Sequence, residues 1–321
     1  MRGILPPPRE MRDGVARVRA CATLTRNVLG ATDLLRDVAL VGAGGFGVGI
    51  VVYVGCSFAL MRAHTDARST WAVLREALRE VLWALLTQPL VPLFYFVGRR
   101  LGDGGGRVPV VVVHGYSQNR VNFLRIARAL AKVKSGPIYG FNYAWFARVP
   151  ASAEKLARFV EDVKRETGAA QVDLVCHSLG GLVAMEYLRG RGAGLVRRCV
   201  TIASPHGGVA YRGPIVGACA TDLRVGSDLL RSHAAHTLAV PCLSIYSAHD
   251  NVVHPPATST LAHRGGRDHV VSHLSHLSLL FSPAVAYEVA DFLGAVAPET
   301  RARGASSVTA AATELRRGLI G

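Results

Sequence analysis

From residue 108 onward the chain predicts an α/β domain with a mostly parallel sheet flanked by helices. Apolar strand-like runs alternate there with helical patterns, which is the order of repeated βαβ units. Half of the 321 residues are apolar, enough for one large core and an appendage. The glycine-rich stretch GDGGGR at 102–107 is typical of a linker. We therefore expect a membrane-anchoring helical region at 1–107, the α/β domain at 108–298 and a flexible tail at 299–321.

Six strands and four helices account for most of the predicted α/β domain. The strands are expected at 108–115, 137–143, 171–177, 197–204, 240–250 and 268–273. The helices are expected at 121–133, 153–168, 180–190 and 282–296. Ligands of such sheets bind beyond the carboxyl ends of the strands. Polar residues that follow a strand are therefore the candidates for a functional site.

An apolar segment precedes this domain. Residues 38–61 carry no charge over 24 positions, and as a helix they would extend about 36 Å against a hydrocarbon core of about 30 Å. Six glycines would weaken a helix in a soluble core, whereas small residues are tolerated between packed membrane helices. About 37 residues come before the segment, which disfavours a cleavable signal. We expect a membrane span, in a bacterial inner membrane.

A second uncharged stretch, at 81–98, is shorter and is broken by Gln88, Pro89 and Pro92. It could span the membrane or lie in its interface. Just before it, Trp71 and leucines share one helical face and arginines another, as in a helix on a membrane surface or one packed against the α/β domain. Seven arginines before residue 38 favour an inside N-terminus, so one span puts the domain outside and two keep it inside. Both topologies remain open.

The charge is strongly basic but evenly distributed. The formal net charge of +15 divides into +6 before residue 108, +7 over 108–298 and +2 in the tail. No aromatic-interleaved basic stripe or nucleic-acid motif accompanies it, so we exclude nucleic acid as a partner and favour attraction to anionic lipid. Six scattered cysteines have no C-x-x-C spacing, which predicts neither a metal site nor a disulfide framework. We expect no cofactor.

The heptapeptide VCHSLGG at 175–181 follows an apolar strand and predicts a sharp turn that exposes Ser178 for nucleophilic attack. Small residues must flank such a turn, and Gly180 and Gly181 satisfy this on the helix side. Cys176 stands on the strand side where glycine is usual, so the G-x-S-x-G pattern is broken. An ordinary strand-to-helix turn with a hydroxyl cap is the alternative.

A serine nucleophile needs a histidine base, and the histidine needs a carboxylate that fixes its tautomer. His276 lies after the last predicted strand, where a loop can reach over the sheet, and His273 is its main rival. Asp250 ends a predicted strand, whereas Asp268 begins one and is therefore at the wrong end of the sheet. The resulting order along the chain is Ser178, Asp250, His276.

The oxyanion formed on attack needs backbone amides aimed at it. Leu179 follows the nucleophile and should supply one. Tyr116, in HGY after the first predicted strand, should supply the other. We expect the His114 side chain to brace this loop.

Residues 108–297 resemble the bacterial lipase and esterase branch of the α/β-hydrolase superfamily. The resemblance rests on HGYSQN, VCHSLGGLVAMEYL, TIASPHGG, SAHDNVVHP and SHLSLLFSP, in that order. It implies an α/β-hydrolase fold and ester hydrolysis through an acyl-enzyme, with Ser178, Asp250 and His276 as triad. The final motif is the reason for preferring His276. The sequence departs from the family at Cys176 and in having no recognisable calcium-site motif.

Between SPHGG and VPCLS, about 30 residues at 207–236 predict either a cap over the site or a plain crossover helix. The leading hypothesis is a membrane-anchored lipase or carboxylesterase whose partners are a lipid or acyl ester and the membrane. Acyl transfer or thioester cleavage by the same triad remains open. So does an inactive hydrolase fold that binds membranes. Oligomeric state is undetermined.

Overall fold

The structure is a computed structural model that describes residues 36, 40–62, 69–95, 98–133, 135–211, 213 and 215–294. The chain divides into two compact units, Met1–Tyr53 and Val54–Gly321. The tail predicted at 299–321 and nearly all of the arginine-rich stretch before residue 38 lie outside the described residues. The predicted domain boundary at 107 falls inside the second unit.

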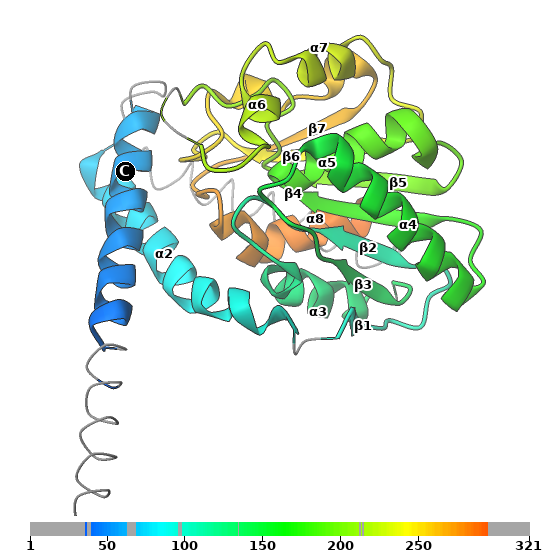
Figure 1. Cartoon of the computed structure of the whole chain (residues 1–321), viewed down its shortest axis with the longest axis horizontal. Coiled ribbons are helices and arrows are strands. Elements are labelled where there is room, and N and C mark those ends of the chain that lie inside the picture. Colours follow the sequence, from blue (N-terminus) through cyan, green and yellow to red (C-terminus); the bar gives the residue numbers. More distant parts are fainter. Residues whose placement is uncertain are drawn as a thin grey trace, which may run out of the picture. The chain divides into compact units, whose positions relative to one another are not determined.

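A seven-stranded sheet forms the centre of the second unit (Figure 1). Its order is β1-β3-β2-β4-β5-β6-β7, with β1 antiparallel to β3 and every other pair parallel. The strands are β1 Arg100–Gly102, β2 Val110–Val113, β3 Ile138–Phe141, β4 Val172–His177, β5 Val196–Ile202, β6 Cys242–Ser247 and β7 Arg267–Val271. All six predicted strands are present. The edge strand β1 was not predicted, because it is short and overlaps the glycine-rich linker.

Helices cover both faces of this sheet. They are α3 Leu124–Lys132, α4 Val149–Thr167, α5 Leu179–Tyr187 and α8 Pro283–Phe292. Helix α4 packs on α5, α3 packs on α8, and the two pairs lie on opposite faces of the sheet (Figure 1). Because both faces are covered, β2, β3, β4 and β6 are buried throughout, which explains why they are continuous apolar runs.

The chain reverses direction across the sheet at β2. From β2 it moves outward to β3 and then returns to β4 on the other side of β2. Such a reversal opens a crevice beyond the carboxyl ends of the two central strands, and this is where ligands of open α/β sheets bind. Ser178 follows β4 and the HGY loop follows β2, so both belong to this edge.

The connection from β5 to β6 carries two short helices, α6 Ala220–Leu223 and α7 Asp228–Ala234. It is therefore neither a single crossover helix nor an extended loop. Buried Asp222 accepts hydrogen bonds from Arg148 Nε (3.0 Å) and Val149 N (2.8 Å), which fastens the connection to the start of α4. The remaining turns are η1 Gln88–Tyr95, η2 Arg120–Phe123, η3 Leu188–Gly192, η4 Pro256–Ser259, η5 Ala262–Arg264 and η6 Ser278–Phe281.

Two helices precede the sheet. The apolar segment forms a helix at Leu40–Arg62, and its last turns in the second unit bury Val54, Phe58 and Met61. Helix α2 (Thr70–Thr87) begins at Ser69, whose hydroxyl accepts from Ala72 N (3.3 Å). Regular helix ends before Pro89, which lacks an amide hydrogen, and the chain continues as η1.

Helix α2 packs against the α/β domain, as one of its two alternatives predicted, but its leucine face is not the face that is buried. Its buried positions include two glutamates, whereas Trp71 and the leucines point outward. The exposed apolar side chains are Trp71, Leu74, Leu78, Leu82, Leu85 and Leu86. We call this set the outer apolar stripe of α2.

Candidate active site

Ser178 occupies a sharp turn between β4 and α5. Its φ of +53° and ψ of −125° lie outside the regions that most residues adopt. Two backbone hydrogen bonds hold the turn: Ser178 N donates to Ile202 O (2.8 Å), and Gly181 N donates to Ser178 O (2.9 Å). Backbone strain that is held in place by its surroundings is a common feature of functional sites. The sharp strand-to-helix turn predicted at Ser178 is therefore present, and the Ser178 side chain accepts no capping hydrogen bond.

Glycines around the turn are required by close packing. A Cβ on Gly180 would collide with the carbonyl oxygens of Val113 and His114, and one on Gly181 would collide with the Ser204 side chain. A Cβ on Gly115 would lie 2.8 Å from Ser178 Cβ. The start of α5 therefore packs closely on the end of β2 and on Ser204, and the loop after β2 packs closely on Ser178.

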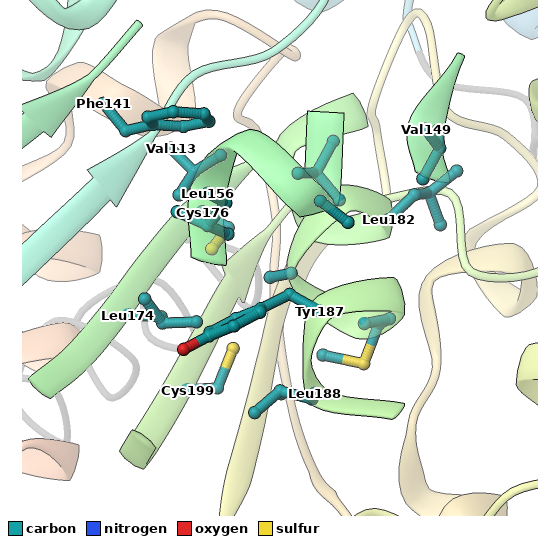
Figure 2. Close-up of a cluster of buried hydrophobic side chains, with 14 of the residues drawn as sticks. Val113, Phe141, Val149, Leu156, Leu174, Cys176, Leu182, Tyr187, Leu188 and Cys199 are labelled. Carbon is teal, nitrogen blue, oxygen red and sulfur yellow. The ribbon is translucent and has the colours of Figure 1, made fainter. Parts of the chain in front are cut away.

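Cys176, the departure from the glycine pattern, is fully buried. Figure 2 shows it within the cluster of buried side chains that also includes Leu156 of α4 and Leu182 of α5. The thiol thus fills core space beneath the elbow.

Asp250 and His276 meet at the carboxyl edge of the sheet. His276 Nδ1 lies 2.8 Å from Asp250 Oδ2 and 3.1 Å from Oδ1. Asp250 Oδ1 also accepts from Val252 N and Val253 N, each at 2.8 Å, so the carboxylate is fixed by its own loop. Burial lowers the pKa of His276, but the Asp250 carboxylate and then Glu80 raise it, and the net pKa lies above the ordinary value. This arrangement favours the Nδ1–H tautomer and leaves Nε2 as the basic nitrogen.

His273 and Asp268, the alternatives to His276 and Asp250, have other partners. His273 is partly exposed, has a φ of +61°, and places Nδ1 3.3 Å from Glu76 Oε1. Asp268 in β7 accepts from Thr260 Oγ1 and, at 2.8 Å, from Leu261 N. Asp268 therefore fastens a turn.

The loop after β2 carries Tyr116 beside the elbow. His114 stacks on Tyr143 with 4.4 Å between ring centroids, and Tyr143 Oη donates to His114 O (2.8 Å). Burial lowers the pKa of His114 to about 4, so its ring is neutral at physiological pH. These contacts brace the loop, as predicted for His114. The Tyr116 hydroxyl donates to Val216 O (2.9 Å), which joins the loop to the β5–β6 connection.

Three supporting residues escaped the sequence analysis. Gln118 Oε1 accepts from Gly115 N (2.9 Å) and contacts His177 Nδ1 (2.9 Å), which ties the loop after β2 to the elbow. Asn251 Oδ1 accepts from His276 N (2.9 Å). Glu80 of α2 accepts from Leu277 N (2.8 Å). A glutamate within a leucine-rich helix was the available signal for Glu80. Among the described residues, no cluster of three or more His, Cys, Asp or Glu is placed to hold a metal ion.

Comparisons with known proteins point to one group. Residues 107–258 match the family model described as lipase (class 2). A triacylglycerol lipase from Burkholderia plantarii is 28% identical over 163 residues, 46% of this chain. Similar solved structures include lipase B of Aspergillus fumigatus (TM-score 0.50, 17% identity, 58% of this chain and 52% of that one) and a mature lipase of Bacillus licheniformis (TM-score 0.50, 15% identity, 60% and 93%).

The family match covers four of the five motifs that carry the predicted resemblance and ends before SHLSLLFSP, which contains His276. The structural similarity, at this low identity, supports the fold. The chain spans about half of the length of the curated relative it matches, since the alignment covers 45% of that protein.

Proposed function

We propose that this chain, a relative of the bacterial lipases and esterases of the α/β-hydrolase superfamily, is a membrane-associated serine hydrolase that cleaves acyl esters. The observation that carries the proposal is the convergence of a strained serine, a carboxylate-paired histidine and a glycine-lined loop at one edge of the sheet. We assign Ser178 as nucleophile, His276 as base, Asp250 as its partner, and the amides of Tyr116 and Leu179 as oxyanion donors.

The reaction follows from these roles. Nε2 of His276 takes the hydroxyl proton as Ser178 Oγ attacks the ester carbonyl, and Asp250 stabilises the imidazolium that forms. The amides of Tyr116 and Leu179 stabilise the oxyanion, each by about 3 kcal/mol if they act as typical donors do. The histidine then gives its proton to the departing alcohol, leaving an acyl-enzyme. Water activated by the same histidine hydrolyses the acyl-enzyme and restores Ser178.

Two apolar surfaces support membrane association: the helix Leu40–Arg62 and the outer apolar stripe of α2. The helix Leu40–Arg62 has 23 residues, and its most apolar 18-residue window has a mean hydropathy of 1.8, so its length and composition are sufficient to cross a bilayer. Core helices of soluble proteins can be equally apolar, but only 28% of its most apolar window is buried. In the second unit, the outer apolar stripe of α2 gives a surface of the kind that lies in a lipid interface. The net charge of +15 adds attraction to anionic lipid.

The test is hydrolysis of p-nitrophenyl esters of increasing chain length by the purified full chain and its Ser178→Ala variant in detergent. We expect activity that rises with chain length and falls by about three orders of magnitude or more in the variant, with unchanged thermal unfolding. Comparable rates in the two proteins would refute Ser178 as nucleophile. Activity that appears only when an alcohol or thiol acceptor is added would indicate acyl transfer instead. A wild-type chain that neither turns over nor reacts with a fluorophosphonate would indicate an inactive fold.

A further inference from the structure

The buried face of α2 carries two carboxylates where a packed helix usually carries apolar side chains. Glu76 is 1% exposed and Glu80 5% exposed, and the leucines of the same helix point outward. Taking a carboxylate out of water is costly unless it is hydrogen-bonded or paired. A buried glutamate therefore needs hydrogen-bond partners that compensate for its burial. The partners of Glu80 indicate what this residue does.

Within the part of the chain that the structure describes, the hydrogen-bond partners of Glu80 belong to the loop that carries His276. Oε1 accepts from Leu277 N (2.8 Å), and Oε2 accepts from Ser278 N (3.1 Å), Ser275 Oγ (2.6 Å) and Ser278 Oγ (3.2 Å). One side chain of α2 thus binds the residues immediately before and after His276. The two amides have fixed donor geometry, so an ionised carboxylate fits this position and an amide does not.

A second contact from the N-terminal helices holds the same loop. His276 N donates to Asn251 Oδ1 (2.9 Å), and Asn251 Nδ2 donates to Ser57 Oγ (2.7 Å) at the end of the first helix. Ser57 donates in turn to Val54 O (2.8 Å). The loop is therefore fastened on two sides by segments that precede the α/β domain in the sequence.

Three titratable groups face the His276 ring. Asp250 contacts Nδ1, Glu80 acts through its charge, and the His177 ring lies with its centroid 4.7 Å away. Burial and then the charge of His276 hold the pKa of His177 well below its usual range, so His177 is neutral. Burial raises the pKa of Glu80, while its hydrogen bonds and the charge of His276 oppose that rise. The Glu80 charge in turn helps to raise the pKa of His276.

We propose that Glu80 is a positioning residue for the catalytic base, and that helix α2 thereby completes the active site. Its carboxylate fixes residues 275–278 so that the His276 ring stays directed at Asp250. The inference rests on the proposed function, because it assigns the base to His276. It also means that α2, predicted as part of an anchor, belongs to the catalytic unit.

The experiment compares Glu80→Gln with Glu76→Gln in the full chain. The control makes the same change one helical turn away, at a carboxylate whose Oε1 lies 3.3 Å from His273 Nδ1. The pKa of His276 is measured by NMR titration of histidine Cε1, with the resonance assigned through His276→Gln. The rate at which a fluorophosphonate modifies Ser178, kcat, KM and thermal unfolding are measured on the same proteins.

Glu80→Gln should lower kcat and the phosphonylation rate by about ten- to hundredfold, because displacement of a catalytic group by about 1 Å has effects of this size. KM should change little. The pKa of His276 should fall in Glu80→Gln and stay at the wild-type value in Glu76→Gln. An unchanged His276 pKa in Glu80→Gln, or an equal fall in both variants, would overturn the proposal.

Ser275→Ala is the second variant if Glu80→Gln does not fold. It removes one hydrogen bond to the Glu80 carboxylate but keeps the charge of Glu80. The pKa of His276 should therefore stay at the wild-type value while the phosphonylation rate falls. An unchanged rate would contradict the positioning role. A wild-type chain that hydrolyses no ester and reacts with no phosphonate would refute the proposed function alone, because the NMR titration measures the coupling of Glu80 to His276 without any substrate.

Discussion

At the scale of the residue, Asp250 and Asp268 differ in their position relative to the carboxyl ends of the strands. Asp250 follows β6 at the carboxyl edge, where it meets the His276 ring, whereas Asp268 lies within β7 and binds the turn at Thr260 and Leu261. The two aspartates are 18 positions apart in the sequence, and each has hydrogen-bond partners of its own. They are therefore a matched pair for mutation.

We predict that Asp250→Asn lowers kcat by about 10⁴, because an amide beside Nδ1 favours the wrong histidine tautomer. Asp268→Asn should keep kcat within about an order of magnitude and reduce stability, since it weakens hydrogen bonds that fasten a turn. Kinetics on a soluble ester and thermal unfolding of both variants check this. The reverse pattern, with Asp268→Asn inactive, would exclude Asp250 as the partner of the base.

Cys176 gives a second prediction at this scale. Replacing it with glycine removes a fully buried side chain and loosens a central strand, so we expect a loss of about 2 to 3 kcal/mol in the free energy of unfolding. Cys176→Ala should cost less because it keeps Cβ. Denaturant unfolding measures both, and the phosphonylation rate of Ser178 should stay near that of wild type. A large rise in that rate for glycine would mean that the thiol hinders the elbow.

At the scale of the element, α2 presents different chemistry on its two faces. Its inner face fastens the His276 loop, and its outer apolar stripe is left exposed by the rest of the second unit. An isolated amphipathic pattern does not reveal which face is buried, because leucines suit a protein core and a lipid interface equally. In the structure the two glutamates are buried, and Glu80 accepts hydrogen bonds from the His276 loop, whereas the leucines are exposed.

For this helix we predict that Trp71, which is 75% exposed, inserts into lipid. In vesicles containing anionic and brominated lipids, the full chain should show strong tryptophan quenching, and Trp71→Phe should remove most of it. Trp83→Phe is the control, because Trp83 stacks on Phe281 with 4.0 Å between centroids. Quenching that survives in Trp71→Phe would show that the outer apolar stripe does not meet the membrane.

At the scale of the whole molecule, burial of neutral histidines makes stability depend on pH. Burial lowers the pKa of His114 to about 4 and that of His206 to about 3, from an ordinary value near 6.5. The unfolded chain therefore binds protons at a higher pH than the folded chain. This contribution to stability is complete above pH 6.5 and is lost as the pH falls toward the folded-state pKa.

We predict that the free energy of unfolding decreases between about pH 6.5 and pH 4, with about 3 kcal/mol attributable to His114 alone. His276 has a raised pKa and therefore acts in the opposite sense. Its contribution to stability is lost as the pH rises through the pKa of His276 in the folded state. Denaturant unfolding at several pH values checks the trend. A stability that stays flat from pH 7 to pH 4.5 would contradict it.

The sequence by itself was sufficient for the fold class and for the resemblance to lipases and esterases. Continuous apolar runs predict buried parallel strands, because both faces of such a sheet are covered. Motifs such as VCHSLGG predict a turn, because turn geometry depends on neighbouring residues. The comparisons support the resemblance, whereas the assigned triad and oxyanion donors stay predictions for mutation to test. Membrane anchoring and the domain limits also stay predictions.

Only the tertiary structure decided how distant segments combine. It placed His273, the rival of His276, beside Glu76 of α2, while the predicted pair of Asp250 and His276 lies in contact. It joined the short strand β1 to the sheet through pairing with β3. It also placed Glu80 against residues nearly 200 positions later in the chain. A contact at that separation leaves no periodicity or motif in the sequence, since its physical cause is the packing of α2 on a loop that local patterns do not position.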